Sequence, residues 1–153
     1  MKSSLTPIFL FLSGLMLLTV GGASLFVPHL FYAHDGILLG HDPSLLSEIR
    51  ASGGLLTGSS MVLLMGAVRP VLRSLAVTLS VLVYGSFGLA RLLGLAIDGM
   101  PSDSLLMAMI VELVVAAIGL VILGRKSEAA STMNNHSGLT TNTYSDQVPS
   151  LSD

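Results

Sequence analysis

The chain has 153 residues and a net charge of −2; 52% of its residues are hydrophobic and only 10% are charged. Soluble domains average about 25% charged residues. Together with the mean hydropathy of +0.81, this composition excludes a fully water-exposed surface and indicates a single membrane domain. The absence of a basic stripe excludes a nucleic-acid partner. The absence of cysteine excludes disulfides, thiolate metal sites and a cysteine-linked lipid anchor.

Four apolar stretches follow one another along the chain, each close to the ~20 residues with which a helix crosses a ~30 Å hydrocarbon core. Barrel strands would alternate in polarity over about 10 residues, whereas these stretches are longer and continuously apolar. Because backbone groups in lipid must be satisfied internally, we predict an all-α, four-helix transmembrane bundle. Its helices are expected at about 7–27, 43–68, 71–97 and 101–124.

The predicted helix ends carry matching capping signals. The first stretch is longer than the apolar core of a cleaved signal peptide, about 7–15 residues, so we favour a retained helix over that alternative. Asp42 followed by Pro43 reads as an N-cap before the second helix, and Pro101 stands near the start of the fourth. Gly99 fits the left-handed position that ends the third helix.

The last part of the sequence differs in character from the rest. Residues 127–153 are rich in Ser, Thr and Asn and contain few large apolar side chains. Such a segment cannot bury enough surface to offset its ordering entropy. We therefore predict a transmembrane domain at 1–126 and a disordered tail at 127–153.

The basic residues are distributed unevenly between the two sides of the predicted bundle. Arg50 is the only basic residue near the first and third loops. The two termini and the middle loop together carry Lys2, Arg69, Arg73, Arg125 and Lys126. Because basic residues accumulate on the cytoplasmic side, both termini and the tail are predicted to be cytoplasmic.

Two charged residues, Arg91 and Glu112, lie within the apolar stretches. Arg91 precedes Asp98 by seven residues, which places it roughly 10 Å from that helix end. Glu112 follows Ser104 by eight residues, or roughly 12 Å from the same side of the bundle. An unpaired charge near the bilayer centre costs on the order of 3 kcal/mol or more, so we expect the two side chains to face each other.

Other polar residues lie toward the same end of the bundle. On the third helix Tyr84, Arg91 and Asp98 are spaced by seven residues and share one stripe, while the start of the second helix holds two more charges. The predicted polar cluster comprises Glu48, Arg50, Tyr84, Arg91, Asp98 and Glu112. It either forms a ligand-binding site or serves as a buried device that fixes helix register.

Small residues predict where helices approach one another closely. Gly88 lies on the stripe of Arg91, and Gly54 and Gly58 form a G-x-x-x-G pair typical of packed membrane helices. The double glycines at 21–22 and 53–54 are likewise interpreted as packing sites, because neither pair sits in a phosphate-binding motif.

Other residue types with binding chemistry form no motif. His29, His34 and His41 are expected in an irregular loop, at spacings that match no metal site. The eight methionines are spread along the apolar stretches and are interpreted as packing residues. No metal, cofactor or catalytic triad is predicted.

One stretch resembles a known family. The residues Glu48-Ile49-Arg50-Ala51-Ser52-Gly53-Gly54-Leu55, followed by Arg91-Leu92-Leu93-Gly94, Asp98-Gly99 and Glu112-Leu113, are similar to a bacterial group of small membrane proteins, domain-of-unknown-function family 4345. The resemblance covers roughly residues 7–124. It implies a four-helix protein of the bacterial inner membrane without an assigned activity. It also suggests that the charged residues of the predicted cluster act together, namely Glu48, Arg50, Arg91, Asp98 and Glu112.

The leading functional prediction is a binding or accessory membrane protein, whose polar cluster holds a lipid head group, a small ligand or a partner helix, including one from a second copy. A small-solute or proton-coupled carrier is the alternative. It is disfavoured because four unbroken helices leave little room for a path through the bilayer. An intramembrane enzyme is less favoured still, because Glu112 alone would have to act as acid and base.

Overall fold

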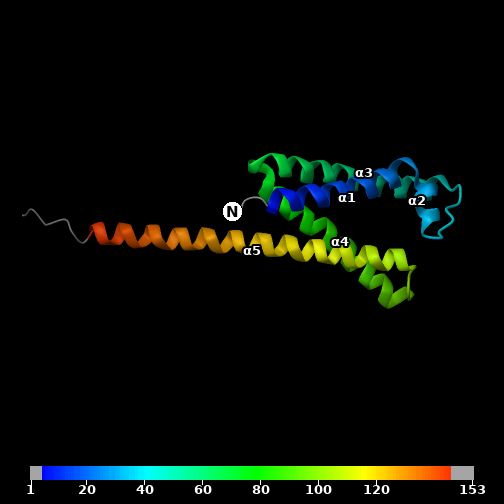
Figure 1. Ribbon diagram of the computed structural model, residues 1–153. Coiled ribbons are helices and arrows are strands. Elements are labelled where there is room, and N and C mark those ends of the chain that lie inside the picture. The colour runs from blue at the N-terminus through cyan, green and yellow to red at the C-terminus, as the bar shows by residue number, and fades with distance from the viewer. Residues whose placement is uncertain (1–4, 146–153) are drawn as a thin grey trace, which may run out of the picture.

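The computed structural model describes residues 5–145, and the side chains of residues 5–125. Within these limits every regular element is helical (Figure 1). In chain order the elements are α1 (Leu5–Phe26), α2 (Pro28–His34), α3 (Pro43–Val68), the 3-10 helix η1 (Pro70–Leu72), α4 (Arg73–Asp98) and α5 (Asp103–Ser145). The predicted four-helix transmembrane bundle is confirmed, because four segments are long and apolar enough to cross a membrane: Leu5–Phe26, Pro43–Val68, Pro70–Asp98 and Asp103–Arg125.

The bundle consists of two antiparallel helical hairpins. α1 packs along α3, α4 packs along α5, and the hairpins meet mainly through α3 and α4. We call the end that contains η1 the η1 end, and the end that contains α2 and the α4–α5 connection the α2 end. Figure 1 shows α4 diverging from the α1–α3 hairpin toward the α2 end. The two hairpins are therefore close at one end and splayed at the other.

Glycines bring α1 and α3 into backbone contact. A Cβ at Gly21 would lie 2.7 Å from the backbone nitrogen of Thr57, and one at Gly53 would lie 2.8 Å from the backbone nitrogen of Leu25. Gly54 and Gly58 make no such contact within this chain, because a Cβ added at either residue would have no neighbouring atom within 4 Å, and their role in helix packing stays a prediction. One residue is a rotation of about 100° on a helix, so Gly54 points away from the contact that Gly53 makes.

Small residues also set the distance between α4 and α5. A Cβ at Gly88 would come within 2.7 Å of the Leu113 side chain, and one at Gly119 within 2.5 Å of Val81. Gly88 therefore lies in a helix contact on the stripe that the sequence indicated. Larger residues at either position would push the two helices apart.

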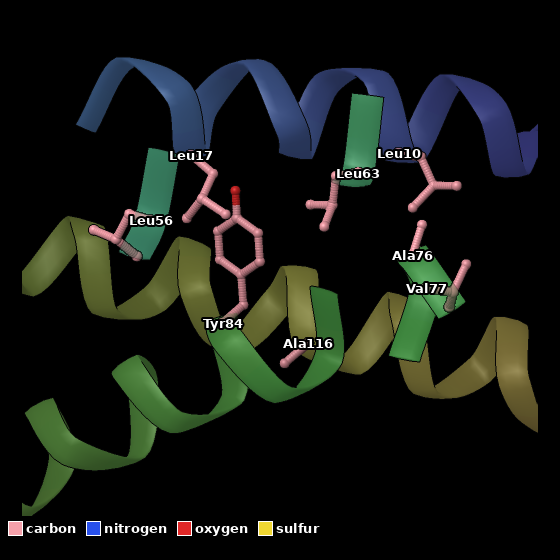
Figure 2. Close-up of a cluster of buried hydrophobic side chains, with 8 residues drawn as sticks. All are labelled: Leu10, Leu17, Leu56, Leu63, Ala76, Val77, Tyr84 and Ala116. Atoms are coloured by element: carbon pink, nitrogen blue, oxygen red, sulfur yellow. The ribbon is translucent and has the colours of Figure 1, made fainter. Parts of the chain in front are cut away.

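All four long helices contribute to the core. Figure 2 shows its apolar residues, in which Leu10, Ala76 and Val77 group toward the η1 end, while Leu17 and Leu56 lie toward the α2 end. Leu10, Leu63 and Ala76 have no exposed surface. Many large apolar side chains outside this core are exposed, as expected for helices that face lipid.

The connection between α1 and α3 is more ordered than predicted. Residues expected in an irregular loop form the short helix α2, because Pro28 supplies a suitable first residue. The Asp42 side chain accepts a hydrogen bond of 2.9 Å from the Ser44 amide, which confirms the predicted N-cap of α3. Gly99 has a φ of 95°, a left-handed conformation that explains why α4 ends there.

α5 passes the predicted domain boundary at residue 126 without a break. Its membrane-spanning part is Asp103–Arg125, and helical backbone continues to Ser145. Figure 1 shows this end of α5 extending away from the other helices. The disorder predicted for 127–153 thus stays a prediction, and residues 146–153 lie outside the described residues.

Candidate functional site

Arg91 of α4 and Glu112 of α5 form an ion pair, as predicted from their equal depth. The Arg91 Nε donates to both carboxylate oxygens of Glu112, at 3.2 Å to Oε1 and 3.0 Å to Oε2. The Glu112 side chain is only 11% exposed, whereas that of Arg91 is 30% exposed. No other salt bridge occurs among residues 5–125. The acid is therefore the buried partner, and the guanidinium is the accessible one.

Tyr84 lies two helical turns before Arg91 on α4 and connects the two hairpins. Its hydroxyl donates a 2.5 Å hydrogen bond to the backbone carbonyl of Ser13 on α1. Figure 2 shows the Tyr84 ring pointing from α4 toward α1. The residue is 2% exposed, so this bond satisfies a hydroxyl that would otherwise be buried without a partner.

A pocket lies beside the ion pair, where the hairpins diverge. It has an empty volume of about 350 Å³, including its open side. Its polar lining consists of Tyr84, Arg91 and Glu112. Its apolar lining comes from α1, α3 and α4, through Met16, Leu17, Val20, Leu56, Val83 and Phe87. Apolar walls with a few converging polar groups are typical of small-molecule sites.

The remaining members of the predicted cluster do not line this pocket. Arg50 instead donates from Nη1 to the Leu25 carbonyl at 3.2 Å, an interaction that satisfies a carbonyl at the end of α1. Glu48 and Asp98 are exposed and form no ion pair with any described residue. The structure thus brings together Tyr84, Arg91 and Glu112 and separates them from the other three.

The α2 end of the bundle has further polar contacts. Ser104 at the start of α5 donates a 2.6 Å hydrogen bond to Oδ1 of Asp35, which follows α2. The rings of His29 and His41 lie 5.5 Å apart, centroid to centroid. No group of three or more histidine or acidic residues within the described chain could hold a metal ion.

Sequence reasoning missed the apolar half of the pocket. Met16, Leu17 and Val20 contribute the α1 wall, yet in the sequence they are indistinguishable from the lipid-facing residues around them. The available signal was indirect: Tyr84 carries a hydroxyl that needs a buried partner on another helix. That requirement indicates a second helix near Tyr84 but does not say which one.

The arrangement defines a class of protein: a four-helix membrane protein with one intramembrane ion pair beside a small, largely apolar pocket. The sequence pattern of the family described as "Domain of unknown function (DUF4345)" matches residues 5–123. The chain belongs to this family. No curated protein and no solved structure matches the chain.

Proposed function

We propose that this protein is a ligand-binding membrane protein and that the pocket beside Arg91 and Glu112 is its binding site. The observation that carries this proposal is the pocket itself, which is lined by residues of all four long helices and places Arg91 and Glu112 against apolar walls. Apolar walls around a few polar groups are the usual lining of ligand sites. An ion pair that only fixed helix register would need no cavity next to it.

The packing at the η1 end favours binding over transport. Leu10, Leu63 and Ala76 are completely buried there, and Gly66 of α3 lies in direct contact with Ala76 of α4. A carrier needs access to its site from both sides of the membrane. A site that packed helices close off toward the η1 end suits a binding or accessory protein better than a carrier.

An enzymatic role receives less support from the geometry. The Tyr84 hydroxyl donates to a backbone carbonyl, and both Glu112 oxygens accept from Arg91. None of these groups is paired with a nucleophile in the way that covalent catalysis requires. The pocket supports recognition of a ligand better than its conversion.

Two neighbouring residues of α4 allow a matched test of the pocket. Val83 lines it, while Leu82 is 60% exposed on the outer surface. We expect Val83→Phe to fill the pocket and Leu82→Phe to leave it open. Mass spectrometry of small molecules retained by each full-length variant after gentle detergent purification should show a species that is lost from Val83→Phe and kept by Leu82→Phe.

A stability control and a contradicting outcome make this experiment decisive. Both variants must unfold within a few degrees of the unchanged protein, so that loss of the ligand is not loss of the fold. If the same small molecules accompany both variants in equal amounts, the pocket is not a binding site and the ion pair is structural.

We further propose that the protein lies in the bacterial inner membrane with both termini in the cytoplasm, so that the α2 end faces outward. The support is the basic residues at the η1 end, of which Arg69 and Arg73 flank η1. A reporter enzyme fused after Gly124 should behave as cytoplasmic, and one inserted at Gly40 as external. The opposite result would reverse the orientation and place the pocket toward the cytoplasm.

A further inference from the structure

The hydrogen-bonding groups that line the pocket are already partly used. The Tyr84 hydroxyl donates to Ser13, and the Glu112 carboxylate accepts two hydrogen bonds from Arg91. Both of those bonds come from Nε, and the two terminal amino groups of Arg91 donate to no described residue. The accessible polar part of the pocket is therefore a guanidinium with only donors to offer.

A donor-only planar group selects a particular kind of ligand. The two terminal amino groups of a guanidinium form a fork that matches the paired oxygens of a carboxylate or a phosphate. A neutral ligand would use fewer of these donors, and a cationic ligand would be repelled. The Arg91 side chain retains 30% exposure, so the head group of a ligand could reach the fork.

The walls of the pocket select the rest of the ligand. Six of the nine lining residues are apolar, and they extend along α4 to Val83 and across to α1 and α3. The pocket is open on one side, so a ligand whose head group lies at Arg91 would have the first part of one hydrocarbon chain between these walls. The remainder of the chain would extend out of the open side.

We propose that the pocket binds an anionic amphiphile, a single-chain molecule whose carboxylate or phosphate head accepts hydrogen bonds from the terminal amino groups of Arg91. This inference rests on the proposed function, and it adds the charge and shape of the ligand. Glu112 acts as a positioning residue, because its two bonds to Nε hold the guanidinium and leave both terminal amino groups for the ligand.

The test compares probes that share one dodecyl chain and differ only in the head group. Dodecyl phosphate, dodecanoate, dodecyl maltoside and dodecyltrimethylammonium are added at equal concentrations to the full chain in a non-ionic detergent. Inorganic phosphate is added separately. Native mass spectrometry then measures the fraction of protein that carries each probe. Because charge-assisted hydrogen bonds are the strong ones, we expect the preferred anionic probe to bind roughly 10- to 100-fold more tightly than the maltoside.

Two variants connect this preference to Arg91. Arg91→Lys keeps a positive charge beside Glu112 but removes the planar fork, so the ratio of anionic-probe binding to dodecyl maltoside binding should fall about tenfold. An unfolding midpoint within a few degrees of the unchanged protein shows that the bundle is still formed. Val83→Phe should reduce binding of every dodecyl probe, and Leu82→Phe should reduce none.

The outcomes separate this inference from the proposed function. Equal binding of anionic and neutral probes, or an anionic preference that survives Arg91→Lys, would overturn the assigned head group while Val83→Phe still reported a working pocket. Inorganic phosphate binding as tightly as dodecyl phosphate would overturn the amphiphile and leave a simple anion site. If Val83→Phe changes neither the probes nor the co-purified molecules, both proposals fail together. The tighter binder of dodecyl phosphate and dodecanoate identifies the head group of the ligand as phosphate or carboxylate.

Discussion

The two ends of the bundle are built from different residues. At the η1 end, Leu10, Leu63 and Ala76 are completely buried, and Gly66 lets α3 and α4 touch. At the α2 end, the hairpins separate around a pocket that is bordered by Arg91 and Glu112. Small and apolar residues thus close one end, whereas charged residues and a cavity occupy the other.

This difference separates stability from recognition within one small fold. Dispersion contacts between closely approaching helices drive association in lipid, where there is little hydrophobic driving force between them. The η1 end supplies such contacts. The α2 end forgoes some of them to leave room beside a costly ion pair, an arrangement that is understandable if that end carries the function.

The largest expected effect lies at the α2 end, in the ion pair. Removing one partner of a buried pair typically costs about 3–5 kcal/mol, because the other charge is left uncompensated. We expect Arg91→Leu to cost more than Glu112→Leu, since the carboxylate that it strands is only 11% exposed. The double variant should recover part of the loss, and a double-mutant cycle in detergent unfolding measures the coupling.

The double-mutant cycle also distinguishes a structural ion pair from one that belongs to the binding site. If the two single losses simply add in the double variant, the pair contributes no interaction energy and the contrast between the two ends disappears. If the double variant is stable but no longer retains the ligand, the pair belongs to the binding site rather than to the scaffold.

The second effect tests the close packing of the η1 end. Gly66→Val would force a side chain against Ala76 and the Leu10 side chain, and overpacking of this kind typically costs about 1–3 kcal/mol. Gly58→Val on the same helix is the matched control, because no atom lies within 4 Å of the added Cβ. It should change stability by no more than about 0.5 kcal/mol.

The control variant Gly58→Val also tests whether the protein self-associates through α3. A large loss of stability in Gly58→Val would show that this face of α3 packs against another chain. The G-x-x-x-G pair of Gly54 and Gly58 would then serve self-association, as the sequence alone suggests. Size measurement of the detergent-solubilised protein distinguishes a lost dimer from a damaged monomer.

A smaller effect is expected where the two ends meet. Tyr84→Phe removes the hydrogen bond to the Ser13 carbonyl and should destabilise the protein by about 0.5–1.5 kcal/mol. Tyr32→Phe is the control, because no hydrogen bond involving the Tyr32 hydroxyl is present among the described residues. Equal stability of both variants would show that the link between α4 and α1 is apolar contact alone.

The smallest effect is expected beyond the bundle. Deletion of residues 127–153 should leave membrane insertion and the thermal unfolding midpoint nearly unchanged, because a segment poor in large apolar residues cannot bury much surface. Circular dichroism of the two proteins tests the predicted disorder, since a helical tail would raise the helical signal of the full chain. A marked drop in the unfolding midpoint would show that the tail docks on the bundle.

Much of the fold could be read from local sequence features. The four helices follow from uninterrupted apolar stretches of membrane-spanning length, and the start of α3 follows from Asp42 and Pro43. The contact between Arg91 and Glu112 follows from helix rise and the high cost of an unpaired charge in lipid. These features depend on residue type and spacing along one or two neighbouring helices, so the sequence contains them directly.

The features that were missed depend on the rotation and tilt of helices. Both Gly53 and Gly54 were interpreted as packing residues, but only Gly53 contacts α1. Apolar patterning cannot resolve this difference of one residue when lipid-facing and core-facing residues are equally hydrophobic. The short helix α2 was missed because its seven residues carry too little periodicity to predict. The separation of Arg50 from the ion pair depended on how far α3 and α4 diverge.

The sequence by itself determined the class of the protein, its four membrane-spanning segments and its intramembrane ion pair, because hydropathy and charge are properties of single residues and short stretches. Only the tertiary structure decided where the hairpins close and where they open. That outcome depends on the summed shapes of side chains from all four helices. The pocket exists because Met16, Leu17 and Val20 of α1 lie opposite Val83 and Phe87 of α4, a juxtaposition that no single helix encodes.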